Sequence, residues 1–223
     1  MKRETLSYPF WSPEEIEAAL GPALEQLELR RVLAYPTETV YGFGGAIDRE
    51  SVANLIKLKR RQPGKPFLLL IDGSEMLTSL DLQLPAYAAT LAARFWPGPI
   101  TLVLPGGQGR VPVQLRGPEG GIAVRWTSHS AIRRLIRAHG NPVTSTSANR
   151  PGVAPAMVVG EILAQWPDAV ARGELRVLDG GRLVPSEPST VVDCMGRYPR
   201  VIRRGAISSR VLRESVPGLI GDP

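Results

Sequence analysis

The chain has 223 residues, 43% of them hydrophobic and 22% charged, which fits one globular domain of ordinary size. No apolar run approaches the roughly 18 residues that cross a bilayer, and the only cysteine, Cys194, excludes an internal disulfide and a Cys-rich zinc site, so we expect a cytoplasmic protein without membrane segments. The 27 Lys and Arg exceed the 21 Asp and Glu, which favours polyanionic partners, although this charge alone fits a merely soluble surface equally well.

The first part of the chain is predicted to alternate helices with buried strands. Ser12 and Glu15 form a capping box that begins a helix running to about Arg30. Asp48 is placed to cap a second helix, whose apolar residues recur at helical spacing. Buried strands are predicted in the apolar runs 32–35 and 67–71.

The alternation continues to the end of the chain. Helices are predicted near 86–95, 130–138 and 160–171, and strands at 100–104, 122–126, 142–145, 175–178, 189–193 and 200–203. This order predicts an α/β or mixed α+β fold. We expect one domain over 12–207, with an N-terminal extension over 1–11 and a C-terminal tail over 208–223. Gly and Pro cluster between the elements, which predicts long loops of the kind that often carry a site.

The familiar nucleotide-binding motifs are missing from the sequence. Gly42 and Gly44 follow a predicted strand, but Ile47 stands where the dinucleotide fingerprint needs a third glycine. Gly64 and Lys65 are followed by Pro66, so there is no Walker A loop. If this protein handles ATP, it does so in another way.

Two polar clusters stand at the ends of predicted elements in the first third of the chain. Residues 36–44 place hydroxyls, a carboxylate and flexible backbone after a buried strand, a pattern that also fits a self-satisfied turn. Residues 57–65 hold five cations at the end of a helix, where cations also favourably meet the helix dipole.

Further polar groups follow later strands. Residues 145–149 offer small hydroxyls and an amide that suit phosphate or ribose oxygens. Residues 188–193 form another cluster, followed by a basic segment that holds Arg203. Arg125 lies inside the apolar run 122–126, where an unpaired charge is costly, so it needs an anionic partner, either a protein carboxylate or a ligand.

Together these clusters resemble the YrdC-like family, whose best known members are the threonylcarbamoyl-AMP synthases of tRNA modification. The matching segments occur in family order over 12–207 and are residues 35–44, the pair Lys59 and Arg61, and residues 96–101, 123–125, 145–149 and 189–193. The resemblance implies a single-domain, twisted, open mixed sheet flanked by helices, with a positively charged concave cavity.

The resemblance also implies a reaction. Members of the family convert ATP, L-threonine and bicarbonate or CO2 into threonylcarbamoyl-AMP and pyrophosphate, which makes them nucleotidyltransferases. A downstream threonylcarbamoyl transferase complex of the TsaB/TsaD/TsaE type then modifies tRNA. The carbamate of threonine is already an anionic oxygen nucleophile, so the reaction needs alignment and charge neutralisation more than a Ser-His-Asp constellation. Mg²⁺ is implied as the companion of ATP.

Site residues follow from the resemblance and from the chemistry of their side chains. Glu38 is a candidate proton acceptor or water-mediated metal contact, and the metal ligands stay unassigned. Lys59 and Arg61 are the candidate catalytic residues. The candidate threonine-binding residues are Thr37, Tyr41, Arg125 and Thr190, and the candidate nucleotide-binding residues are Lys59, Arg61, Thr101, Ser145, Ser147, Asn149, Ser189 and Arg203.

Some residues depart from the family pattern. Leu68, Leu69 and Leu70 occupy the stretch where longer two-domain relatives carry a histidine, and 223 residues leave no room for their additional domain. Gln62 and Arg204 each replace a usual proline, which puts the shape of the first loop and the aim of Arg203 in doubt.

Two other functions stay open. One is a catalytically silent binder of tRNA or double-stranded RNA, and the other is a relative that makes a carbamoyl adenylate from a different donor.

Overall fold

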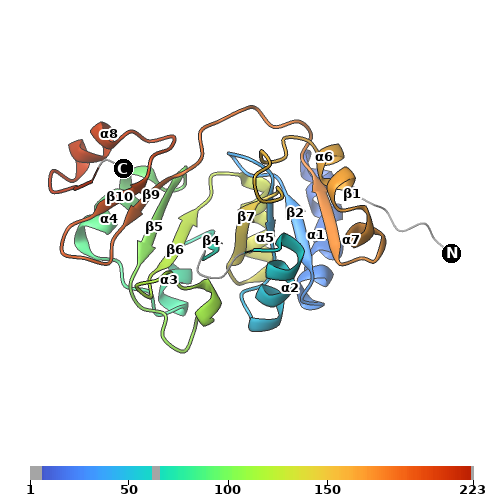
Figure 1. Cartoon of the computed structure of the whole chain (residues 1–223), viewed down its shortest axis with the longest axis horizontal. Helices are drawn as coiled ribbons and strands as arrows, with labels where there is room; N and C mark the ends of the chain where they lie inside the picture. Colours follow the sequence, from blue (N-terminus) through green and yellow to red (C-terminus); the bar gives the residue numbers. More distant parts are fainter. Residues whose placement is uncertain (1–6, 62–65, 222–223) are drawn as a thin grey trace.

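The computed structural model describes residues 7–61 and 66–221. Gln62 and Lys65 lie outside this range. The loop shape at Gln62, where the family usually has proline, and the last cation of the basic cluster 57–65 are therefore not described. Within the described residues, ten strands form one mixed sheet in the order β1-β8-β2-β3-β7-β4-β6-β5-β9-β10 (Figure 1). The predicted fold class, an open mixed sheet flanked by helices, is confirmed.

The strands of this sheet are short, and parallel and antiparallel pairs are mixed along it. Parallel pairs join β8 to β1 and β2, β4 to β6, and β5 to β9, and the other neighbours are antiparallel. The bounds are β1 Ser7–Pro9, β2 Val32–Tyr35, β3 Gly42–Gly44, β4 Leu68–Ile71, β5 Ile100–Leu104, β6 Ile122–Trp126, β7 Val143–Ser147, β8 Leu175–Asp179, β9 Thr190–Asp193 and β10 Arg200–Arg203.

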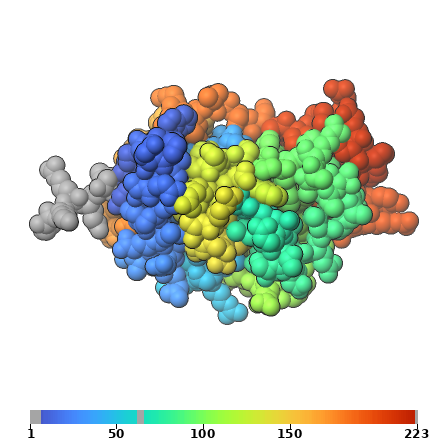
Figure 2. Space-filling view, turned by 180° about the vertical axis from the view of Figure 1, so that it is seen from behind, coloured from blue at the N-terminus to red at the C-terminus, as the bar shows by residue number. Residues whose placement is uncertain are grey.

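Helices cover the sheet and its edges. Seen from behind, the surface runs in bands from α1 (blue) through α5 (yellow) to α3 and α4 (teal and green) (Figure 2). The bounds are α1 Pro13–Glu28, α2 Arg49–Lys59, α3 Glu75–Ser79, α4 Ala86–Phe95, α5 Ser130–His139, α6 Val159–Gln165, α7 Pro167–Ala171 and α8 Ser209–Ser215, with a 3-10 turn at Val113–Leu115.

The two predicted helix caps are confirmed. The Ser12 hydroxyl accepts from the Glu15 amide at 3.2 Å, and the Glu15 carboxylate accepts from the Ser12 amide at 2.9 Å. The Asp48 carboxylate accepts from the amides of Glu50 and Ser51 at 3.0 and 3.1 Å. These bonds satisfy amides that a helix start leaves without partners, and they fix where α1 and α2 begin.

One predicted helix is interrupted. The helix expected over 160–171 is two helices, α6 and α7, because Trp166 leaves helical geometry and Pro167 begins the second one. A proline lacks the amide that a continuous helix needs and crowds the preceding turn. The strand expected at 142–145 instead extends to Ser147, so the Ser and Thr hydroxyls of 145–147 belong to β7 itself.

Both predicted terminal segments contain regular structure. Within 1–11, residues Ser7–Pro9 form β1 and pair with β8 at the edge of the sheet. Within 208–223, α8 packs beside α4, and the side chains of Leu212, Val216 and Leu219 are buried. In the described parts of the chain, every helix is too short or too polar to cross a bilayer.

Candidate functional site

A cleft of about 830 Å³ opens over the middle of the sheet. It is walled by residues from β3 to β7, from β9 and β10, and from four connecting segments. Its polar and charged lining side chains are Thr37, Thr39, Arg61, Thr101, Arg125, Ser145, Thr146, Ser147, Ser186, Ser189 and Arg203. No Asp or Glu belongs to this lining among the described residues, so three guanidinium groups face the cleft beside hydroxyls.

A segment over 180–189, here called the crossing segment, passes above the sheet from β8 to β9 (Figure 1). The Ser186 hydroxyl donates to the backbone carbonyls of Glu38 and Thr39 at 3.3 and 3.1 Å. The Leu183 amide donates to the Met157 carbonyl at 2.9 Å. These bonds tie the crossing segment to two other loops and place Ser186 in the wall of the cleft.

The loop after β2 is held by its own hydroxyl groups. Thr37 Oγ1 donates to the Val40 carbonyl at 2.7 Å and accepts from the amides of Thr39 and Val40 at 3.2 Å each. The loop is thus the self-satisfied turn that the sequence allowed, and Thr37 and Thr39 still line the cleft. The cluster over 36–44 therefore contains a self-satisfied turn and also contributes to the wall of the cleft.

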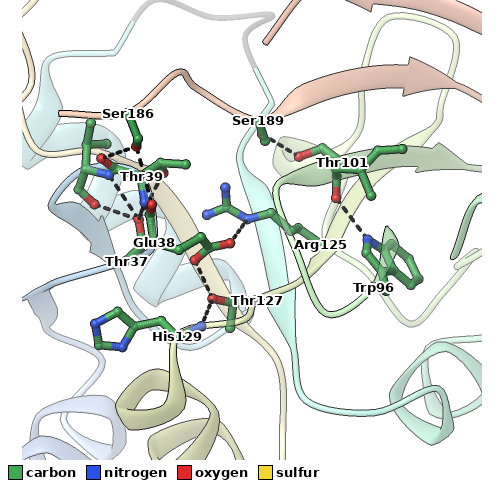
Figure 3. A network of polar contacts seen from close by, with 12 residues as sticks. Thr37, Glu38, Thr39, Trp96, Thr101, Arg125, Thr127, His129, Ser186 and Ser189 are labelled. Carbon is green, nitrogen blue, oxygen red and sulfur yellow. Dashed lines mark hydrogen bonds and ion pairs between the residues drawn. The ribbon is translucent and has the colours of Figure 1, made fainter. Parts of the chain in front are cut away.

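Arg125 is buried in β6, and its anionic partner in the protein is Glu38. Arg125 Nε lies 3.5 Å from Glu38 Oε1, and neither atom has a hydrogen bond. The other carboxylate oxygen of Glu38 accepts from the Thr127 hydroxyl at 2.7 Å. Figure 3 shows the guanidinium end of Arg125 directed toward the loop that carries Thr37 and Thr39. Glu38 itself is not part of the cleft lining.

A second polar group joins β5, β9 and β10. The hydroxyls of Thr101 and Ser189 lie 2.9 Å apart, and Arg203 Nη2 donates to the Ser189 carbonyl at 2.8 Å and to its hydroxyl at 3.0 Å. Burial and the nearby Arg125 charge lower the pKa of Arg203. Two cations that repel one another across a cleft favour an anion between them.

The third group lies where α2 ends against β7. Lys59 Nζ donates to the Ser147 carbonyl at 2.7 Å, to Asn149 Oδ1 at 2.9 Å and to the Asn149 carbonyl. Arg61 Nη1 donates to Thr146 Oγ1 at 3.0 Å, and its guanidinium lies 4.5 Å from the centre of the Phe67 ring. Burial, helped by the Arg61 charge, lowers the pKa of Lys59 to about 8.

Most of the candidate site residues come together in this cleft. The lining contains Thr37, Arg61, Thr101, Arg125, Ser145, Ser147, Ser189 and Arg203. Lys59 and Asn149 are not among the described lining residues. They are bonded to each other, and Lys59 is also bonded to the Ser147 carbonyl of β7.

Tyr41 and Thr190, two of the candidate threonine-binding residues, are not among the described lining residues. The Tyr41 hydroxyl donates to the Gly181 carbonyl at 2.7 Å and accepts from the Gly180 amide at 3.0 Å. The Thr190 hydroxyl exchanges hydrogen bonds with the backbone of Ile207 at 2.7 and 3.0 Å. Both hydroxyls are therefore used to fasten neighbouring loops.

Several lining residues were not predicted from the sequence. Thr39 and Thr146 stand beside chosen residues, whereas Ser186, Met157 and Ile202 come from loops or an edge strand far along the chain. The clusters of Gly and Pro predicted loops between the elements, but nothing in the sequence indicates that the loop over 180–189 crosses the cleft.

The described lining residues do not include a set of carboxylate, histidine or cysteine ligands for a metal ion. The described residues contain no group of three or more His, Cys, Asp or Glu side chains that could hold a metal ion. The carboxylate of Glu38 is already engaged by Arg125 and Thr127. A metal ion in this cleft would have to take most of its ligands from its substrate and from water.

Comparisons with known proteins agree on the relatives of this chain. The family of Sua5, YciO and YrdC, described as telomere recombination, matches residues 25–205. The threonylcarbamoyl-AMP synthase of Escherichia coli O6:H1 is 41% identical over 175 residues, which are 76% of this chain and 89% of that protein.

Two solved structures show the same fold. Sua5 of P. abyssi, solved in complex with L-threonine, has a TM-score of 0.81 at 30% identity and covers 94% of this chain. This chain spans 60% of that protein. E. coli YciO has a TM-score of 0.77 at 25% identity, covering 88% of this chain and 93% of its own.

Proposed function

Because the chain belongs to the Sua5, YciO and YrdC family, we propose that it is a threonylcarbamoyl-AMP synthase acting in the threonylcarbamoyladenosine modification of tRNA. Its substrates in this proposal are L-threonine, bicarbonate or CO2, and ATP. The observation that carries the proposal is the cleft itself, in which three arginines and a set of hydroxyls face one space with no carboxylate in the described lining.

The reaction in this proposal is a nucleotidyl transfer. The amine of threonine combines with CO2 to give a carbamate, and a carbamate oxygen attacks the α-phosphorus of ATP. A new oxygen–phosphorus bond forms, the bond between the α-phosphorus and the bridging oxygen breaks, and pyrophosphate leaves. The nucleophile is already anionic, so the protein must mainly align the reactants and neutralise charge.

Arg61, Arg203 and Lys59 supply that charge. Arg61 and Arg203 face the cleft and suit the forked binding of phosphate oxygens. Lys59 reaches phosphate by exchanging one of its carbonyl contacts at the end of β7 for the ligand. Ser145, Ser147, Thr101 and Ser189 offer hydroxyls for the remaining nucleotide oxygens.

Magnesium enters this proposal with the nucleotide. The described lining residues present no carboxylate for it, so Mg²⁺ arrives as part of the MgATP substrate and keeps its phosphate and water ligands. The product passes to a downstream threonylcarbamoyl transferase complex, which modifies tRNA.

Pyrophosphate release tests the proposal directly. The purified protein is incubated with MgATP and bicarbonate, and L-threonine is compared with L-serine, glycine and no amino acid. The expected result is release that requires threonine and bicarbonate together. Release without any amino acid would indicate another donor or plain ATP hydrolysis, and no release at all would favour an RNA-binding function.

Two substitutions connect that activity to the cleft. Lys59→Ala and Ser147→Ala are expected to lower kcat/KM by roughly 100-fold or more, because each removes a group from the phosphate side of the site. Circular dichroism spectra like that of the unaltered protein would show that the fold is retained. Unchanged rates in both variants would place the chemistry elsewhere.

A further inference from the structure

The contacts of Arg125 are divided between its two ends. The Nε edge faces Glu38, with a distance of 3.5 Å between Arg125 Nε and Glu38 Oε1. The guanidinium end is directed into the cleft toward the Thr37 loop (Figure 3). The Nε edge of the Arg125 guanidinium thus faces a protein carboxylate, whereas its two terminal nitrogens are placed to bind a ligand.

Glu38 is itself held by the strand that carries Arg125. Thr127 follows the end of β6 and is fully buried, and its hydroxyl donates to Glu38 Oε2 at 2.7 Å. The same hydroxyl accepts from the His129 amide at 3.2 Å, just before α5. A chain of contacts therefore runs from the start of α5 through Thr127 and Glu38 to Arg125.

The contact between Glu38 and Arg125 is incomplete. Glu38 Oε1 and Arg125 Nε are both buried and lack a hydrogen-bond partner. A shift of roughly 0.6 Å would bring them to the usual distance of about 2.9 Å. Contacts of this kind are often long in a ligand-free site and tighten when the ligand binds.

We propose that Glu38 is a positioning residue that orients Arg125 for forked binding of the carboxylate of the amino acid substrate. The inference rests on the proposed function and adds to it the part of the substrate that Arg125 recognises. The terminal nitrogens face the hydroxyl-rich loop at Thr37. Arg61 is bonded to Thr146 of β7, and β4 lies between β7 and the strand β6 that carries Arg125. A planar carboxylate matches two parallel N–H groups, and Glu38 keeps them aimed at it.

The test compares Michaelis constants for the two substrates in the Glu38→Gln variant. Glutamine keeps the size of the side chain and removes the charge that faces Arg125 Nε. The KM for L-threonine is expected to rise by roughly 10- to 100-fold, because a buried charge pair is broken. The KM for ATP is expected to stay within about twofold of its original value, because Glu38 does not touch the phosphate side of the cleft.

Two further variants keep the test clear if Glu38→Gln folds poorly. Thr127→Val removes the hydroxyl that holds Glu38 and is expected to raise the KM for threonine by roughly 3- to 10-fold. Asp72→Asn is the matched control, because Asp72 is a buried carboxylate paired with Arg133 and Arg137 away from the cleft. Its Michaelis constants are expected to be unchanged, whatever happens to its stability.

A spectroscopic measurement is independent of turnover. In nitrogen-15 spectra, the Arg125 Nε–H signal is identified by its loss in Arg125→Lys. We expect it to shift when L-threonine is added to the unaltered protein, and to shift less in Glu38→Gln.

The possible results separate the two proposals. If the unaltered protein releases no pyrophosphate with threonine, the proposed function fails, and the spectra still report whether threonine reaches Arg125. If that protein is active but Glu38→Gln keeps its KM for threonine, or raises both Michaelis constants equally, the positioning role is overturned and the function stands.

Discussion

At the scale of single residues, Lys59 supplies a positive charge that the proposed site needs, but its buried position favours the neutral amine. Its side chain is buried, its ammonium group is bonded to the Ser147 carbonyl at the end of β7, and its pKa is lowered to about 8. Burial disfavours the charged form, and a phosphate beside it would favour that form again. Nucleotide binding and protonation of Lys59 are therefore linked.

This linkage predicts how nucleotide affinity depends on pH. Below pH 8 Lys59 is already protonated in the free protein, and above pH 8 the proton must be taken up on binding. The dissociation constant for ATP is therefore expected to rise by up to about tenfold between pH 8 and pH 9, measured by calorimetry. Lys59→Arg stays charged and should show a flatter profile, and an equally flat profile in the unaltered protein would contradict the linkage.

The sequence could predict those site residues that stand together in short polar segments or that are unusual for their place in the chain. Arg125 was identifiable because a cation inside an apolar strand needs a partner, but the sequence could not decide between Glu38 and a ligand. The positions of Tyr41 and Thr190 could not be foreseen, because their hydroxyls bond to Gly181 and Ile207, which are distant in the sequence. Side-chain partners of this kind depend on tertiary packing.

At the scale of secondary-structure elements, β3 shows why a short strand can matter. Its three residues, Gly42–Gly44, lie between β2 and β7 near the cleft. A Cβ atom at Gly44 would stand 1.8 Å from the Thr144 carbonyl oxygen, closer than any packing allows. The glycine is what lets β3 approach β7.

Gly44→Ala is therefore expected to destabilise the protein by roughly 3 kcal/mol or more, because the strand must move or the sheet must open. Gly160→Ala is the control, since a Cβ there meets nothing within 4 Å and the residue lies in α6. It is expected to be neutral or stabilising by about 0.5–1 kcal/mol. Urea denaturation of both variants measures the difference, and equal stability of the two would refute the steric argument.

The elements that could be predicted are those with a long apolar run or a cap, such as α1, β5 and α5. The strand β3 carries two glycines among three residues, so no alternating pattern marks it, and its existence depends on its neighbours in the sheet. The same holds for β1, which is defined by pairing with β8 across most of the chain. Sequence patterns report local burial, whereas such strands are created by distant partners.

At the scale of the whole molecule, the C-terminal helix is part of the packed structure. Leu212 of α8 is fully buried, and Arg94 of α4 donates to the Ser215 hydroxyl at 2.7 Å. Leu212→Ala is expected to cost about 2–4 kcal/mol of unfolding free energy through the cavity it leaves. Thermal denaturation measures this, with the exposed Ile220→Ala as control, and equal losses would show that α8 is not firmly packed.

The cleft also links parts of the chain that are distant in sequence, since its walls come from β3 to β7, β9, β10 and the crossing segment. A nucleotide bound there contacts elements that separate on unfolding, so it stabilises the folded state alone. At about 100 times its dissociation constant, MgATP should add roughly 2.7 kcal/mol and raise the melting temperature by about 5–10 °C. Because the contacts are cationic, the shift should shrink as salt is raised. Arg61→Ala should lose most of the shift, and a full shift in that variant would mean that the nucleotide binds outside this cleft.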